Sequence, residues 1–379
     1  MLSKLKHTLS RHLSNLPGWR TKRKIVVIES DDWGSIRMPS KEVYEKLLKQ
    51  GIRVDLCPYN RFDALESRED MEALFEVLSR FKDKNGNHPV VTANTVVANP
   101  DFGKIKDSGF NEYHYEPFTE TYRRYYGSNK VFELWKQGIE QKIFYPQFHG
   151  REHVNVNRWM EALSSGSNET MTAFEHEFFG ISTNITNEKR KSYLAALDFD
   201  NIAELEWQKT MLADGLDLFE KLFGYRSETY IATNYVWHPA LEVHLQKHGV
   251  KAIQGGNSQI IPTLEGKPKI KRHILGEKNT SGQSYLIRNA LFEPSAVANK
   301  DWVYSCLKEI EIAFLWNKPA IISSHRVNYI GFIEARNRSK NMNLLASLLN
   351  KMIEKWPDIE FMSSDKLAQL IRAKNTAND

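Results

Sequence analysis

This sequence of 379 residues contains few cysteines, and it lacks long apolar runs and a leader-like segment. Cys57 and Cys306 are too few for a disulfide framework, which excludes the small disulfide-stapled domains and fits a reducing compartment. No run of about 18 apolar residues occurs, so no segment is expected to span a membrane. Residues 1–16 intersperse leucine with polar residues and lack the apolar stretch of about 7–15 residues that a signal peptide needs. We therefore expect a cytoplasmic protein.

Acidic residues are missing from the first 28 positions, and this absence accounts for the net charge of +5. That stretch holds seven basic residues: Lys4, Lys6, Arg11, Arg20, Lys22, Arg23 and Lys24. The other 45 of the 52 basic residues face 47 acidic ones, so the rest of the chain has no excess of positive charge. The excess of positive charge therefore does not extend over the whole domain, as it would in a nucleic-acid-binding protein, and we expect no nucleic-acid partner.

Residues 1–23 are predicted to form a basic N-terminal arm whose leucines follow a rough helical period. They stand at positions 2, 5, 9, 13 and 16. An amphipathic basic helix binds anionic membrane surfaces, which predicts peripheral contact with the inner face of the membrane. A solvated arm, or a helix packed against the domain, explains the same pattern, and these interpretations stay open.

Strand-like and helix-like segments alternate along residues 24–372. The apolar run Lys24–Ile28 indicates a strand buried on both faces, and Met71–Phe81 has a helical period. The alternation implies a parallel sheet with right-handed crossovers. Polar clusters repeatedly follow the strands, which is where βα-barrel enzymes assemble their sites. We predict one barrel-like α/β domain over residues 24–372, with insertions at about 100–140, 159–222 and 255–285.

Three groups of polar residues at strand ends carry candidate chemistry. Asp31 and Asp32 follow the first strand, and diverging neighbours allow one carboxylate to bind a cation while the other faces substrate. His149 and His153 follow a short predicted strand, and the i, i+4 spacing on a helical turn would let both imidazoles chelate one metal ion. His325 follows the strand Pro319–Ile322, where a histidine suits general-acid catalysis near neutral pH. The alternatives are a capped turn for Asp31 and Asp32, chance spacing for His149 and His153, and a structural hydrogen bond for His325.

Three motifs together resemble the polysaccharide deacetylase family, also called carbohydrate esterase family four. They match in order and in strand context, and they read Ser30-Asp31-Asp32-Trp33-Gly34, His149-x-x-x-His153 and Ile322-Ser323-Ser324-His325. The resemblance extends over nearly the whole chain, from residue 24 to residue 370. It implies a distorted (β/α) barrel of about seven strands with helical and loop insertions.

The resemblance also implies a role for each motif residue. Asp31 is the implied catalytic base and His325 the implied acid. Asp32, His149 and His153 are the implied ligands of Zn²⁺, or of another divalent metal such as Co²⁺, Ni²⁺ or Mn²⁺. The implied activity is a metal-dependent hydrolase that removes an acetyl group from an N-acetylated sugar or polysaccharide intermediate. A carbohydrate is the implied partner, and no oligomeric state is indicated.

The third motif of the family is matched only in part by Tyr230–Tyr235. Tyr235 is present, and its backbone N–H is expected to help hold the oxyanion, but the Arg of that motif is missing. Further candidate contacts to substrate stand at other strand ends: Trp33, Asn94, Arg151, Arg288, Asn289 and Glu293.

Two other functions are consistent with the same residues. His149–His153 also spells H-x-x-E-H, the motif of a metalloprotease in which Glu152 would be the base. A carbohydrate-binding barrel without catalysis is the second alternative, and the missing Arg favours it. Metal analysis together with a deacetylase assay separates these functions.

Overall fold

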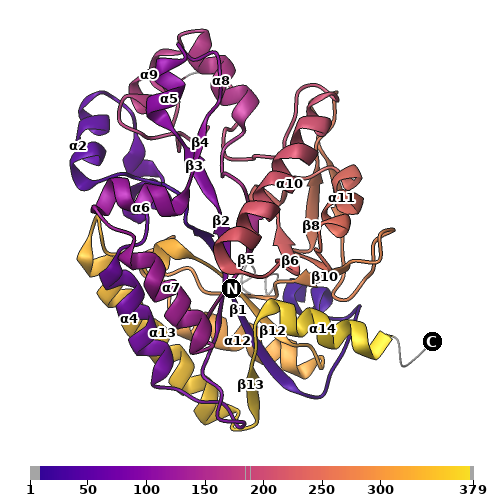
Figure 1. The fold of residues 1–379 in the computed structure, drawn as a ribbon. Coiled ribbons are helices and arrows are strands. Elements are labelled where there is room, and N and C mark those ends of the chain that lie inside the picture. The colour runs from indigo at the N-terminus through magenta and orange to yellow at the C-terminus, as the bar shows by residue number, and fades with distance from the viewer. Residues whose placement is uncertain (1–8, 184, 188, 376–379) are drawn as a thin grey trace.

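The central strand of the protein is β1 (Lys24–Trp33), which contains the apolar run that the sequence predicts (Figure 1). The computed structural model describes residues 9–183, 185–187 and 189–375. Val26 and Ile28 pack with side chains of the helices α4 (Arg68–Ser79), α7 (Lys130–Glu140), α12 (Trp302–Leu315) and α13 (Ala335–Lys355). Ile25 and Val27 belong to a second apolar cluster, so both faces of β1 are buried, as expected for a parallel strand.

The main sheet is entirely parallel and follows chain order around the molecule. From β1 it runs in one direction through β2 (Val91–Val96), β5 (Phe144–Gly150), β6 (Thr229–Ile231), β7 (Ala252–Gly255) and β10 (Ser284–Ile287), and in the other through β12 (Ala320–His325) and β11 (Ala290–Leu291). β13 (Ile359–Phe361) adds to the start of β1.

One split strand joins the two ends of this sheet. β10 pairs with β7, whereas β11, which follows it after two residues, pairs with β12. The change of partner is direct, because Arg288 N donates to Gly255 O at 2.9 Å and Asn289 N donates to Ile321 O at 3.0 Å. Counting β10 and β11 as one strand gives seven strand positions, which confirms the predicted distorted (β/α) barrel.

The crossover connections carry the remaining elements. Figure 1 shows α2, α5, α8 and α9 grouped at one end of the molecule, with α10 and α11 along another side. The bounds are α2 (Lys41–Lys49), α3 (Pro58–Phe62), β3 (Ala98–Pro100), α5 (Phe102–Asp107), β4 (Tyr115–Pro117), α6 (Phe118–Tyr126), α8 (Val156–Ser164), α9 (Asn168–Phe174), α10 (Glu204–Phe223), α11 (Glu242–Lys247), β8 (Ser258–Ile261), β9 (Lys269–Arg272) and α14 (Ser364–Asn375). Of the described helices, none is long and apolar enough to cross a membrane.

The described part of the N-terminal segment lies against the barrel beside the split strand. Residues 9–14 are helical, and the Asn289 side chain donates to Asn15 Oδ1 at 2.9 Å. Lys318, only 2% exposed, donates from Nζ to the carbonyl oxygens of Pro17, Gly18 and Trp19 at 2.7, 2.7 and 2.8 Å. One ammonium group therefore binds three consecutive backbone carbonyls and fixes this segment to the start of β12.

We expect Lys318→Met to release this segment while leaving the barrel folded. The substitution keeps the bulk of the side chain but leaves the three carbonyls without their donor, at a cost of about 3 kcal/mol or more. Trypsin should then cleave rapidly at Arg20, Lys22 or Arg23, as followed by mass spectrometry, and the thermal midpoint should fall. Lys308→Met is the control, because Lys308 is exposed and pairs only with Glu311 on its own helix. Equal trypsin resistance of both variants would contradict this role of Lys318.

Candidate active site

A local distortion of β1 directs two adjacent carboxylates toward one site. Asp31 continues the inward face of the strand and lies level with His325 on β12. Asp32 has a φ of +75°, and the pairing of β1 with β2 shifts register between Ser30 and Trp33. Neighbouring side chains of a regular strand point to opposite faces, so this bulge is what turns Asp32 toward the same end of the barrel.

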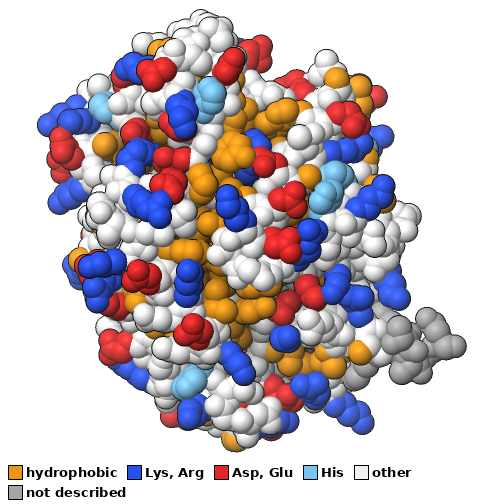
Figure 2. Space-filling model, in the orientation of Figure 1, with side chains coloured by type: hydrophobic (Ala, Val, Ile, Leu, Met, Phe, Trp, Pro, Cys, Tyr) orange, Lys and Arg blue, Asp and Glu red, His pale blue; other side chains and the backbone are white. Residues whose placement is uncertain are grey.

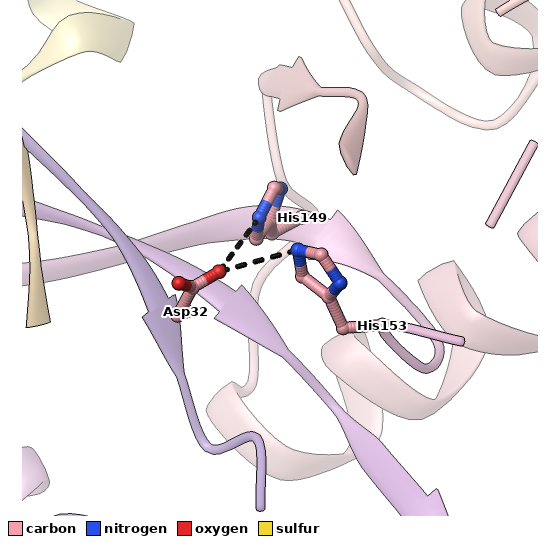
Figure 3. A group of neighbouring side chains, drawn as sticks. All are labelled: Asp32, His149 and His153. Carbon is pink, nitrogen blue, oxygen red and sulfur yellow. Dashed lines mark ion pairs between the residues drawn. The ribbon is translucent and has the colours of Figure 1, made fainter. Parts of the chain in front are cut away.

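Asp32, His149 and His153 converge as the sequence predicts (Figure 3). Asp32 Oδ1 lies 3.4 Å from His149 Nε2 and 3.3 Å from His153 Nε2. All three side chains are buried, and their potential ligand atoms lie within 4.8 Å of one another. Two imidazole nitrogens and one carboxylate oxygen form a donor set that suits Zn²⁺ or a similar divalent ion, with positions left open for water and substrate.

The two histidines reach this arrangement without the helical turn that the i, i+4 spacing predicts. His149 stands near the end of β5, Gly150 follows with a φ of +129°, and His153 lies in the loop before α8. The expectation of a helix was wrong because the chain stays extended through Gly150 and Arg151, whose carbonyl oxygens accept from Val97 N and Ala98 N. The chelating pair is therefore built from a strand end and a loop.

The protonation of the imidazoles favours metal binding. His149 Nδ1 lies 2.9 Å from Ile231 O, and donation to this carbonyl leaves Nε2 unprotonated and directed at Asp32. Burial lowers the pKa of His153 to about 3 despite the attraction of Asp32, so this ring is neutral at physiological pH. His153 is thus in the form that coordinates a cation, and His149 presents Nε2 to the same site.

Arg37 lies behind Asp32, His149 and His153, which are called the candidate metal-ligand group below. Its Nη2 approaches Asp32 Oδ2 at 3.4 Å, on the carboxylate oxygen that the histidines do not share. Burial alone would raise the pKa of Asp32, but its contacts with His149 and His153 and the charge of Arg37 hold it well below its usual value. Asp32 is therefore anionic in this site.

A second buried ion cluster fixes the loops that surround Asp32. The guanidinium of Arg326, just after β12, donates to both oxygens of Asp63 at 3.0 Å and to Glu66 Oε2 at 2.6 Å. Glu66 Oε1 accepts from Gly34 N, two residues beyond Asp32, at 3.1 Å. This cluster ties the loop after β1 to the end of β12.

Arg288 holds the implied base, Asp31, by two hydrogen bonds. Nη1 donates to Asp31 Oδ2 at 2.7 Å and Nη2 donates to Oδ1 at 2.6 Å. Burial alone would raise the pKa of Asp31, but the charge and hydrogen bonds of Arg288, with smaller contributions from His325 and His149, lower it to about 2. The arginine that binds Asp31 therefore lies between β10 and β11 and not in Tyr230–Tyr235.

The same guanidinium binds a second carboxylate deeper in the barrel. Arg288 Nε donates to Glu29 Oε2 at 2.6 Å, and Ser364 Oγ donates to Glu29 Oε1 at 2.7 Å. Asn94 donates to Asp31 Oδ1 at 2.7 Å, and its amide also meets that of Gln254 at 2.9 Å. Asn94 is on β2 and Gln254 is on β7, which are not neighbouring strands, so these contacts cross the barrel interior.

His325 lies on the other side of Asp31 from the candidate metal-ligand group. Its Nε2 is 3.6 Å from Asp31 Oδ2, and its Nδ1 is 2.5 Å from Glu293 Oε1. Burial alone would lower the pKa of His325, but the charge and hydrogen bond of Glu293, followed by the charges of Asp31 and Asp32, raise it to about 9. Asn328 orients Glu293 by donating to its Oε2 at 2.7 Å.

Several predicted substrate contacts have other roles in the structure. Trp33 is only 1% exposed, packs against Trp135 and Phe144, and donates its indole N–H to Ser30, so it belongs to the core. Asn94 and Arg288 position Asp31 instead of facing solvent. Asn289 likewise accepts from Ile321 N and is structural.

Two further predictions about backbone and charge are corrected. The N–H of Tyr235 donates to Ala232 O at 3.1 Å within a tight turn, so it is not available to an oxyanion here. Its hydroxyl instead lies 3.2 Å from Arg288 Nη1.

Arg151 donates to both oxygens of Glu152 and to Asp214, so its guanidinium is fully engaged in ion pairs. Glu152 is completely buried under this pair and is not placed as the base of a metalloprotease.

Sequence reasoning did not assign Glu29, Arg37, Asp63, Gln254 or Arg326 to this site. Glu29 carried a usable signal, because it is a carboxylate inside an apolar strand, and an inward charge needs a buried partner. The others lie on loops or on distant strands, and only the closed barrel brings them near Asp31 and Asp32.

Solved structures similar to this chain include polysaccharide deacetylases, whereas no family model and no curated protein matches the sequence. A putative polysaccharide deacetylase from Mycobacterium smegmatis is 10% identical with a TM-score of 0.44, over 95% of this chain and 94% of that one. A probable polysaccharide deacetylase from Pseudomonas aeruginosa PAO1 is 10% identical with a TM-score of 0.45, over 92% and 91%.

A 4-alpha-glucanotransferase from Thermococcus litoralis is also 10% identical, with a TM-score of 0.43. The match covers 91% of this chain but only 40% of the length of that protein.

We expect the two neighbouring aspartates to differ in their effect on bound metal. Asp32→Asn removes the charge of a ligand, so metal content and kcat should fall together. Asp31→Asn removes only a proton acceptor and should keep the metal while lowering kcat by about 10²–10⁴-fold. Elemental analysis and kinetics on both variants and on His325→Ala, which should behave like Asp31→Asn, test this division. Loss of metal from Asp31→Asn with retention in Asp32→Asn would reverse the two roles.

Proposed function

We propose that the protein is a metal-dependent hydrolase that removes the acetyl group from an N-acetylated sugar or polysaccharide intermediate. The observation that supports this most directly is the pairing of Asp31 with His325 beside the candidate metal-ligand group. A carboxylate whose pKa is lowered to about 2 lies 3.6 Å from an imidazole whose pKa is raised to about 9. Groups with pKa values held this far apart provide a base and an acid at the same pH.

Asp32, His149 and His153 would hold the metal ion. A divalent ion in this position would polarise an acyl carbonyl and lower the pKa of a water molecule. Asp32 is already anionic and His153 already neutral, and the Ile231 carbonyl and Arg37 fix the positions of His149 and Asp32. Little reorganisation is then needed when the ion binds.

Asp31 is proposed to accept the proton of the attacking water. Arg288 and Asn94 occupy its two oxygens from within the barrel, so the carboxylate cannot rotate away from the site. Its low pKa keeps it ionised over the physiological range, although it also makes Asp31 a weak base. The lowered pKa of the water compensates for this weakness.

His325 is proposed to donate a proton to the departing nitrogen. An amine is a poor leaving group unless it is protonated as the C–N bond breaks, and an imidazole with a pKa raised to about 9 is protonated at neutral pH. Glu293 maintains this charge from Nδ1, which leaves Nε2 to face the site. A dedicated cationic acid supports N-deacetylation over O-deacetylation.

The two alternative functions have less support. The metalloprotease needs Glu152 as a base, and Arg151 holds both of its oxygens in a buried ion pair. The inactive carbohydrate-binding barrel was favoured by the missing arginine of the third motif. Arg288 supplies an arginine that binds the implied base, Asp31, so the lack of one in Tyr230–Tyr235 no longer favours an inactive barrel.

We expect release of acetate from a panel of N-acetylated amino sugars and their oligomers. Reaction should depend on added divalent metal and should be abolished in His149→Ala. An enzymatic acetate assay, run in parallel with an O-acetylated panel and a peptide substrate, is the measurement. Cleavage of the peptide, or metal binding without acetate release from any substrate, would contradict the proposed activity.

We expect Glu293→Gln to shift the pH dependence of kcat toward lower pH. The active form needs His325 protonated, so activity is present below its pKa and is lost as the pH rises through about 9. Removing the negative charge of Glu293 lowers that pKa, which moves the alkaline limb down. The exposed Glu140, at the end of α7, provides the matched control variant Glu140→Gln. An unchanged alkaline limb in Glu293→Gln would exclude His325 as the group that titrates there.

A further inference from the structure

Two segments far apart in the sequence expose aliphatic side chains on the outside of the barrel. Leu9 and Leu13, on the N-terminal helix, are 57% and 56% exposed, and Leu16, just after the helix, is 37% exposed. Leu264 and Ile270, on the β8–β9 hairpin, are 61% and 57% exposed. Exposed leucines one helical turn apart indicate an apolar helix face that no described part of the chain covers.

The hairpin also carries four cations that have no carboxylate partner among the described residues. These are Lys267, Lys269, Lys271 and Arg272, and the whole strand β9 is exposed. Elsewhere charges of both signs are interspersed, as Figure 2 shows for the face that it presents. Many exposed lysines and arginines form ion pairs there, for example Lys46 with Glu42. The hairpin is therefore a local excess of positive charge.

The fold places these two segments side by side. Trp19 N, at the end of the N-terminal segment, donates to Leu275 O, just after β9, at 2.7 Å. A cavity of about 350 Å³ separates the N-terminal helix from the hairpin base and is lined by Ser10 and Ser14 from one and by Asn257 and Leu275 from the other. The exposed leucines and the unpaired cations therefore belong to adjoining parts of one surface.

We propose that the N-terminal segment and the β8–β9 hairpin form a docking surface for an anionic phospholipid membrane. Lysines attract the anionic headgroups, and aliphatic side chains next to them enter the headgroup region. A glycan would be bound by aromatic faces, whereas the exposed apolar residues of this surface are Leu9, Leu13, Leu16, Leu264 and Ile270.

The hairpin part of this surface is linked to the candidate site through a loop of the barrel. The root of the hairpin is bonded to the loop after β6, because Trp237 N donates to Ile260 O at 3.1 Å. That loop carries Tyr235, whose hydroxyl contacts Arg288. The proposal concerns binding alone and does not depend on the proposed deacetylation.

Flotation of the full chain with lipid vesicles tests the proposal. The protein should float with vesicles of phosphatidylcholine and phosphatidylglycerol, stay behind with phosphatidylcholine alone, and be released by high salt. A double variant, Lys269→Glu with Lys271→Glu, should bind at least roughly 25-fold more weakly, because each basic residue near the surface contributes on the order of fivefold. Leu9→Ser with Leu13→Ser should also weaken binding without changing the charge.

The matched control is Lys41→Glu with Lys49→Glu on α2, which reverses the same number of charges at the distant end shown in Figure 1. It should bind as the unchanged protein does, and all variants should keep the thermal midpoint because every altered side chain is exposed. Absence of flotation with anionic vesicles overturns the proposal, as does an equal loss in the control. Binding to polygalacturonate without binding to vesicles would identify the surface as a site for an anionic glycan instead.

Discussion

The arrangement of the candidate site depends on one guanidinium group, that of Arg288, buried between Glu29 and Asp31 inside the barrel. Three of its nitrogens donate to the two carboxylates, and both acids are almost completely buried. Burial of an unpaired carboxylate is strongly unfavourable, and removing one partner of such a group costs about 3–5 kcal/mol. The same contact therefore makes two inward charges tolerable, lowers the pKa of Asp31, and holds it where His325 and the candidate metal-ligand group meet.

This dependence explains why the barrel interior is polar near its end and apolar elsewhere. Below the site, Ile25 and Val27 pack in an apolar cluster. From Glu29 onward the inward positions of β1 carry charge, and both Glu29 and Asp31 accept hydrogen bonds from Arg288. A fully satisfied network of this kind is rigid, since every member fixes the orientation of the next.

Sequence reasoning predicted the repeated, local features of the molecule and missed those that closure of the barrel creates. The strand Lys24–Ile28 and the helix at Met71–Phe81 follow from periodicity, and the grouping of Asp32, His149 and His153 follows from motif. The helical turn at His149–His153 was predicted wrongly because the chain stays extended through Gly150 and Arg151. Arg288 was placed only as a substrate contact, because nothing in the chain near position 288 shows that Asp31 lies opposite.

The split of β10 and β11 at Arg288 has a consequence for tolerated changes in length. Residues 284–291 pair with β7 on one side and with β12 on the other, so both pairings fix the register of this segment. Inserting or deleting one residue here would turn every following side chain to the opposite face. The guanidinium would leave the interior while the carboxylates stayed, which makes this short segment the place where the barrel tolerates no insertion or deletion, in contrast to the long loops on either side.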